Sequence, residues 1–171
     1  LTSTGAGSAP AFEALPAGGL SEADTWYLDT TFSLDGTNTS VLTNLSRQGS
    51  AMGTGMTESS GIFTFPSTGH WLITFQTSYR VYVSVAYLYS YINYSTDSGS
   101  SFGNYMNNAG NALSSGGAVV YGHNVISTIL DVTNASTFRA NFSVFSSNGA
   151  STGKIQHGVG TRMSFIKLGE T

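Results

Sequence analysis

The sequence predicts an all-β protein, a β-sandwich of the jelly-roll type with about eight to ten strands. Short segments in which apolar and polar residues alternate recur along the chain, and Gly, Asn and Ser separate them. No segment combines a helical periodicity with helix caps. Charged residues make up only 9% of the chain, against about 25% in an average soluble domain, and hydroxyl and amide side chains take their place.

The chain of 171 residues is long enough for one domain, which we expect to span residues 23–171. Residues 1–22 are rich in Gly, Ala and Ser and contain Pro10 and Pro16, a composition typical of a linker. Two interpretations of this arm stay open: a disordered tail, or a segment that packs on neighbouring copies. Since the sequence starts at Leu1 and shows no signal peptide, we expect it to be a C-terminal piece of a longer protein.

The first half of the domain contains four predicted strands. The clearest covers residues 70–79, where the odd-numbered side chains from Trp71 to Phe75 are large and apolar and the even-numbered ones face the other way. The Gly-, Met- and Ser-rich stretch before residue 61 contains too many glycines to hold a helix. The other three predicted strands cover residues 25–34, 41–48 and 61–65.

The second half begins with a long predicted strand over residues 81–92. Both of its faces carry apolar residues, which is typical of a strand buried on both sides. Residues 93–117 are dense in Ser, Gly and Asn and predict a long polar loop. Three further strands are predicted over residues 119–133, 137–146 and 161–168, with a Gly- and Ser-rich turn region at 147–160.

Composition excludes several classes of function. The six basic residues are scattered, so no patch could neutralise a run of phosphates, and we expect no binding to nucleic acid. No apolar run approaches the roughly 20 residues of a membrane-spanning helix, so we expect no membrane insertion. Cysteine is absent, which removes disulfides, Cys-ligated zinc and thiol nucleophiles together.

Residues suited to catalysis are few, and we expect no enzyme activity. His70, His123 and His157 lie far apart in the sequence, so a metal site would need them to meet in the tertiary structure or between subunits. The nine carboxylates lie mostly at predicted strand ends and turns, where they cap or are solvated, and no two form the pair that glycoside hydrolysis needs. No GxSxG motif is present. A tailspike-type glycan hydrolase is the least favoured alternative.

No cofactor is predicted, and calcium is the one alternative left open. Thr96–Gly99 (TDSG) and the neighbouring asparagines could supply oxygen ligands. However, this segment has a single carboxylate, Asp97, where a calcium loop usually presents several.

Aromatic residues beside Ser, Asn and Gly indicate ligand binding in the predicted loops. The rings give rigid contact area and the small polar residues give adaptable hydrogen bonds. The strand residues Tyr87, Tyr89 and Tyr91 fit a core or subunit contact better than a binding surface. The candidate ligand-binding residues in the loops 93–117 and 147–160 are Tyr94, Asp97, Phe102, Asn104, Tyr105 and His157.

The run from Ser60 to Phe75, SGIFTFPSTGHWLITF, resembles the signature of C1q/TNF-like domains, in which SGxFxxPxxG leads directly into a strand of alternating aromatic residues. Met163–Leu168 (MSFIKL) resembles their closing strand, and the resemblance covers roughly residues 23–171. It implies a ten-stranded jelly roll that forms a compact homotrimer. The chain departs from the family at Asp131–Asn134, a loose analogue of its Gly-Asp-x-Val positions. It also lacks acidic residues that match the family's calcium sites, and any counterpart of the cytokine receptor-binding loops.

Three further segments are similar to C1q-like C-terminal domains of tailed-phage fibres, especially those of marine phages. They are the opening Ser21–Leu28 (SEADTWYL), the fragment Met56–Gly69 and the ending FIKLGET. This resemblance implies a location in the virion and an upstream fibre region joined through the linker. It implies that the trimer contributes to fibre assembly and attaches to a glycan or an outer-membrane protein of the host surface. The alternatives are a purely structural capping or decoration module without a ligand, or a secreted C1q-like lectin.

A threefold assembly needs a flat, uncharged sheet face that contacts two neighbours. A shift of one residue along a strand exchanges the two faces, so the sequence leaves open which side chains point outward. The candidates for the trimer interface are Trp26, Leu28, Leu72, Thr74, Phe142, Val144, Met163 and Phe165.

Overall fold

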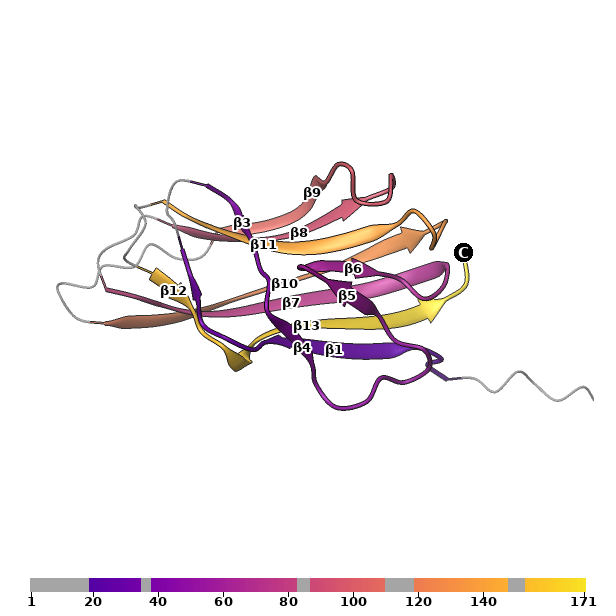
Figure 1. The fold of residues 1–171 in the computed structure, drawn as a ribbon, viewed down its shortest axis with the longest axis horizontal. Coiled ribbons are helices and arrows are strands. Elements are labelled where there is room, and N and C mark those ends of the chain that lie inside the picture. Colours follow the sequence, from indigo (N-terminus) through magenta and orange to yellow (C-terminus); the bar gives the residue numbers. More distant parts are fainter. Residues whose placement is uncertain (1–18, 35–37, 83–86, 110–118, 148–152) are drawn as a thin grey trace, which may run out of the picture.

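A computed structural model describes residues 19–34, 38–82, 87–109, 119–147 and 153–171 and shows two antiparallel sheets packed face to face (Figure 1). In these residues all regular structure is strand, bridge or turn, which confirms the predicted all-β sandwich. The same residues contain no helix that is long and apolar enough to cross a membrane.

The larger sheet is built around the long strand β7, which pairs with β10 along one edge and with β12 and β13 along the other. From β13 the sheet continues through β1 to β4, and β2 extends β12. Its strands are β1 (Ala23–Leu28), β2 (Phe32–Ser33), β4 (Leu45–Arg47), β7 (Gly69–Val81), β10 (Val120–Val132), β12 (Gly153–Ile155) and β13 (Gly158–Gly169).

The smaller sheet runs in the order β5-β6-β11-β8-β9, and β3 also pairs with β11. Its strands are β3 (Ser40–Val41), β5 (Thr57–Ser59), β6 (Ile62–Thr64), β8 (Leu88–Ser95), β9 (Gly103–Ala109) and β11 (Arg139–Ser146). β1 begins and β13 ends at the same end of the sandwich, where the amide of Lys167 donates to the carbonyl of Glu22 at 3.0 Å (Figure 1).

The core between the sheets is dominated by aromatic rings. Phe63 contacts Phe142 edge-to-face at 5.5 Å between ring centroids, and Phe75 lies 5.0 Å from Phe142. Phe165 closes the cluster 5.0 Å from Phe63. Such pairs add roughly 0.5–1.5 kcal/mol each beyond the burial of their area, so this cluster ties the two sheets together.

Residue alternation along β7 is confirmed. Trp71, Ile73 and Phe75 are buried in the core, while Leu72 and the next even-numbered residues lie on the outward face of the larger sheet. Alternate side chains of a strand point to opposite faces, so a strand with one apolar face orients itself.

Three predicted segment boundaries are wrong. The strand expected over 81–92 is two strands in different sheets, since β7 ends at Val81 and β8 begins at Leu88. The polar loop expected over 93–117 is largely strand, because β8 continues to Ser95 and β9 covers Gly103–Ala109. The expected turn region 147–160 contains β12 and the start of β13. Ladder hydrogen bonds stabilise these polar strands without an apolar pattern. Residues 110–117 and 148–152 lie outside the described residues.

The backbone geometry explains why two positions of the SGxFxxPxxG segment are glycine. Gly61 (φ 84°) follows Ser60 in the turn between β5 and β6, and a Cβ there would collide with the carbonyl oxygen of Leu42. Gly69 (φ 134°) opens β7, where a Cβ would collide with the carbonyl oxygen of Gly169. Only glycine combines these backbone angles with such close approach, so the two positions fix where β6 and β7 start.

Candidate functional site

The outward face of β10 exposes three large side chains. Tyr121 is 62% exposed, Val125 55% and Ile129 50%, whereas the even-numbered neighbours Ile126 and Leu130 are buried in the core. The signal for this stripe is present in the sequence as alternation over 119–133, but a strand with apolar residues on both faces does not reveal which set points outward. Large apolar side chains that are exposed together on one face of a strand indicate a contact surface.

Strand pairing extends the part of this stripe from Val125 to Ile129 into three rows across the larger sheet, which we call the three-row face. The first row is apolar and consists of Ile129, Leu72, Ile166 and Ala23. The second row carries only hydroxyls and consists of Ser127, Thr74, Ser164 and Thr25. The third row consists of Val125, Gln76, Arg162 and Tyr27.

Polar groups of the three-row face are largely satisfied within the chain. The hydroxyl oxygens of Thr74 and Ser127 are 2.9 Å apart, and those of Thr25 and Ser164 are 3.4 Å apart. Arg162 contributes the single formal charge of the face. A surface of this kind loses little hydration energy on burial, because few charges must be desolvated.

The structure corrects most of the predicted trimer interface. Leu28, Phe142, Val144, Met163 and Phe165 are each 0% exposed inside the sandwich and have no surface left for a neighbour. Trp26 is half-buried and packs edge-to-face on Phe63 in the core. Of the eight candidates, Leu72 and Thr74 lie on the three-row face.

The error has a simple physical cause. Residues paired directly across neighbouring strands lie on the same face of the sheet. Met163 pairs with Phe75 and Phe165 with Ile73, so both belong to the core face of β7 and not to the face of Leu72. Phe142 and Val144 lie on β11 of the other sheet and fill the same core from the opposite side.

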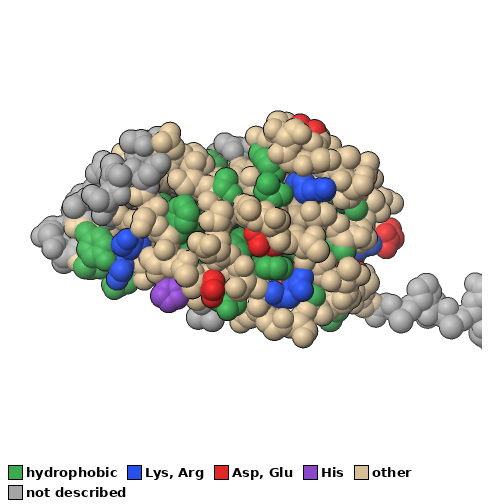
Figure 2. All heavy atoms as spheres, viewed as in Figure 1, with side chains coloured by type: hydrophobic (Ala, Val, Ile, Leu, Met, Phe, Trp, Pro, Cys, Tyr) green, Lys and Arg blue, Asp and Glu red, His purple; other side chains and the backbone are tan. Residues whose placement is uncertain are grey.

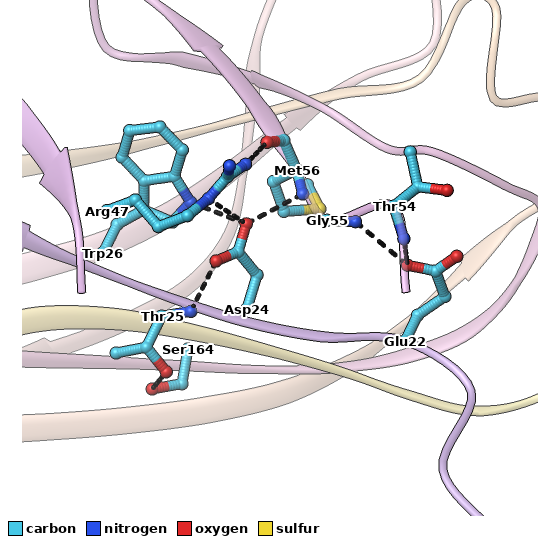
Figure 3. Close-up of polar contacts among 9 residues, drawn as sticks. All are labelled: Glu22, Asp24, Thr25, Trp26, Arg47, Thr54, Gly55, Met56 and Ser164. Carbon is cyan, nitrogen blue, oxygen red and sulfur yellow. Dashed lines mark hydrogen bonds and ion pairs between the residues drawn. The ribbon is translucent and has the colours of Figure 1, made fainter. Parts of the chain in front are cut away.

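A buried carboxylate, Asp24, holds the start of β1 to the chain segment before β5 (Figure 3). Its Oδ2 accepts hydrogen bonds from the Trp26 indole at 2.9 Å and from the Met56 amide at 2.9 Å. The same oxygen forms an ion pair with Arg47 Nε at 3.1 Å, and Oδ1 accepts from the Thr25 amide. Asp24 is therefore an exception to the expectation that most of the acids cap or are solvated.

The neighbours of Asp24 complete this cluster. The Arg47 guanidinium lies 4.9 Å from the centroid of the Trp26 ring and donates to the carbonyl oxygen of Met56. Glu22 Oε2 accepts from the amides of Thr54 and Gly55 at 2.9 and 3.1 Å (Figure 3). With its charge neutralised and its oxygens occupied, Asp24 has the properties of a structural group.

The outward face of the smaller sheet carries an aromatic cluster, which we call the tyrosine cluster: Tyr87, Tyr89, Tyr91 and Phe145. The centroids of Tyr87 and Tyr89 are 4.9 Å apart, and those of Tyr89 and Tyr91 are 5.8 Å apart. Phe145 lies 6.1 Å from Tyr87. Partial burial, with the neighbouring Tyr89 and Tyr87, raises the pKa of Tyr91 above its usual value.

The predicted ligand-binding residues do not form one site. Tyr94 packs against the core and stacks on Phe138 at 5.7 Å, while Phe102 lies between β8 and β9. His157 lies at the other end of the sandwich, between β12 and β13, where its Nδ1 is 2.7 Å from Thr31 Oγ1. The side chains of Asn104 and Tyr105 lie outside the described residues.

Asp97 organises the turn between β8 and β9. It accepts hydrogen bonds from Ser101 Oγ at 2.6 Å, Ser95 Oγ at 2.6 Å and the Ser101 amide at 3.0 Å. These bonds, the Ser101 hydroxyl first, lower the pKa of Asp97 to about 2. Ser98 adopts a positive φ in this turn. Since its oxygens are occupied by the chain's own donors, Asp97 is a turn-forming residue.

The Asp97 turn yields a prediction about pH. The pKa is lower in the folded protein than the ordinary value of 3.8, so the carboxylate contributes stability above that value and loses it as the pH falls through about 2. We expect the side-chain carboxyl of Asp97 to titrate near pH 2 when followed by NMR. The Ser101→Ala variant should titrate closer to 3.8, and an unchanged midpoint in that variant would contradict this assignment.

Among the described residues, no three His, Asp or Glu side chains come together in a way that could hold a metal ion. A hollow of about 320 Å³ at the β5–β6 edge of the smaller sheet contains one acid and one base, Glu58 and Arg139. The Glu58 carboxylate accepts from the Gly61 amide at 2.6 Å. Arg139 donates to the carbonyl oxygens of Phe138 and Ser136 at 2.7 and 3.0 Å. Both charged groups thus stabilise local turns.

Figure 2 shows one side of the molecule, on which only a few charged side chains lie among mostly uncharged ones. This agrees with the low charge content of the sequence. The candidate functional surfaces are therefore the two outward sheet faces, one with the three-row face and one with the tyrosine cluster.

No family model matches the sequence, and no curated protein matches it. Solved structures are similar in fold. Eiger TNF from S. frugiperda superposes with a TM-score of 0.65 at 12% identity, over 87% of this chain and 93% of that one. Murine APRIL at pH 5.0 gives a TM-score of 0.62 at 11% identity, over 86% and 99%. At pH 8.5 it gives 0.60 at 11% identity, over 86% and 98%. The chain is an all-β jelly roll with a TNF-like fold.

Proposed function

We propose that the chain is a self-associating binding domain that forms a homotrimer through the three-row face. The observation that carries this proposal is an outward sheet face with a complete apolar row, a satisfied hydroxyl row and a single formal charge among twelve residues. Burial of such a face is favourable at roughly 25 cal/mol per Å² of apolar area and costs little desolvation. The C1q/TNF-like resemblance implies threefold symmetry, which would let one face contact two neighbours.

The wider context of the proposal is a virion fibre. The similarity of SEADTWYL and FIKLGET to phage-fibre domains supports it, and the chain enters and leaves the sandwich at one end (Figure 1). A fibre joined through residues 1–22 would approach that end and leave the opposite end and the sides of the trimer open to a host surface.

Host attachment is assigned to the tyrosine cluster, because it lies on the sheet opposite the three-row face and stays accessible in the trimer. Tyr87 is 37% exposed, so ring surface is available. Aromatic faces stack on the apolar faces of sugar rings, and tyrosine hydroxyls can bond to the sugar hydroxyls. A host-surface glycan is the ligand that fits this chemistry, and trimerisation would multiply weak single contacts.

The experiment combines light scattering with adsorption to host cells and binding to a glycan array. We expect a mass three times the 17.9 kDa of one chain. The Tyr87→Ala variant should keep this mass and lose most adsorption, while Met52→Ser, which removes another exposed apolar side chain, should retain it. A stable monomer would contradict the trimer. An intact trimer without adsorption or glycan binding would favour a structural capping module.

A further inference from the structure

A second group of side chains lies on the larger sheet beyond the three-row face, at the end where β12 pairs with β7. Register places Tyr121, Arg80, Lys154 and Ser33 in one row across β10, β7, β12 and β2. Tyr79, Val81 and Ile155 are buried in the core, so the alternate residues Arg80 and Lys154 point outward. Figure 1 shows β12 at the end opposite the C-terminus.

Charges in this row are unbalanced. Arg80 and Lys154 are directly opposite each other on neighbouring strands, an arrangement that destabilises a sheet when both charges have the same sign. The ion pairs among the described residues are Asp24–Arg47 and Lys167–Glu170, so neither cation has a carboxylate partner there. Lys154 Nζ contacts Ser33 Oγ at 2.9 Å, and the Arg80 guanidinium lies 5.3 Å from the Tyr82 ring centroid.

Two buried hydrogen-bond donors on this side of the sheet have no acceptor among the described residues. They are Nε of Arg80 and Nε2 of Gln156. The amide of Gln156 donates to the carbonyl of Ser78 at 2.7 Å, which places Gln156 one row along from Lys154 and diagonal to Arg80. Diagonal neighbours in a sheet are within reach of long side chains. Buried donors are almost always paired, so an unpaired guanidinium N–H within reach of an unpaired amide favours a ligand that accepts hydrogen bonds from both.

We propose that Arg80, Lys154 and Gln156 bind a tetrahedral oxyanion, a sulfate or phosphate group. Such a group offers four oxygens to a guanidinium, an ammonium and an amide, and its charge relieves the repulsion between the two cations. The group can be a free ion or a substituent of an acidic polysaccharide. This site lies outside the three-row face and the tyrosine cluster, so it does not depend on the proposed function.

The test is isothermal titration of the whole chain with inorganic sulfate, inorganic phosphate, dextran sulfate and neutral dextran. We expect one anion per chain and no heat from neutral dextran. A response to inorganic sulfate or phosphate identifies a free-ion site, and a response to dextran sulfate alone identifies a polymer-borne group. The double variant Arg80→Gln/Lys154→Gln should lose at least about tenfold in affinity. The matched control Arg139→Gln removes a cation elsewhere and should bind like the wild type.

A second variant supplies the acceptor from within the chain. Gln156→Glu should raise the melting temperature at low salt and abolish the anion response, because its carboxylate would occupy the site. Equal anion responses in wild type and double variant would overturn the proposal, since they would reflect a general salt effect. A changed mass of the double variant would also overturn it, because the cations would then pair with carboxylates of a neighbouring copy. A fall in melting temperature for Gln156→Glu would also overturn the proposal.

Discussion

Asp24→Ala should lower the free energy of unfolding by about 2–4 kcal/mol, the largest loss we expect from one polar substitution. The carboxylate is buried and accepts four hydrogen bonds from Thr25, Trp26, Met56 and Arg47. Its removal leaves the Met56 amide and the Trp26 indole N–H without partners. The Arg47 side chain is 34% exposed, so water can solvate its charge when the carboxylate is removed. The loss in the free energy of unfolding is therefore smaller than when both partners of an ion pair are fully buried.

Urea unfolding of wild type and variant at equal chain concentration measures this difference, since the stability of an oligomer depends on concentration. Asp24→Asn should show an intermediate loss, because the amide nitrogen would face donors. The control Asp29→Ala removes an exposed carboxylate just after β1 and should stay within about 0.5 kcal/mol of wild type. A loss for Asp24→Ala no larger than that of the control would contradict a structural role for the cluster.

Ile129→Asp should convert the proposed trimer into monomers. Ile129 is 50% exposed in the single chain and stands in the apolar row beside Leu72. In the proposed assembly each subunit would bury one new carboxylate among apolar side chains without a cation partner, which costs several kcal/mol per site. Because the side chain is half exposed in the isolated chain, the fold itself should survive.

Light scattering across a concentration series measures the mass, and circular dichroism checks the fold. The control is Val41→Asp, which places the same charge at another exposed β-branched residue, 37% exposed on β3 of the smaller sheet. This variant should remain trimeric. If Val41→Asp dissociates the protein while Ile129→Asp does not, the interface lies on the smaller sheet.

The sequence was most informative where one strand face is apolar and the other polar. In β7 the alternation of Trp71, Ile73 and Phe75 with more polar neighbours predicted the strand and its two faces, and the structure shows that the aromatic face is the buried one. It was least informative where strands are polar. β9 and β12 are held by ladder hydrogen bonds to β8 and β7 and carry no periodic apolar pattern, so they resembled loops.

The binding surfaces also divide into what the sequence predicted and what only the tertiary structure showed. The sequence supplied the tyrosines of β8 and the scattered cations, but not their neighbours in space. Arg80 and Lys154 are 74 positions apart and become opposed only through the pairing of β7 with β12. Likewise, the eight interface candidates mixed two faces because the relative register of β7 and β13 is a tertiary property.

By itself, the sequence determined that this protein is an all-β, weakly charged jelly roll with a resemblance to C1q/TNF-like domains, since composition, turns and alternation are local properties. Only the tertiary structure decided which side chains point outward and which meet across strands, because facing and pairing depend on register between distant segments. The structure thereby moved the candidate contact surface from the core residues Phe142 and Phe165 to the row of Ile129, Leu72 and Ile166.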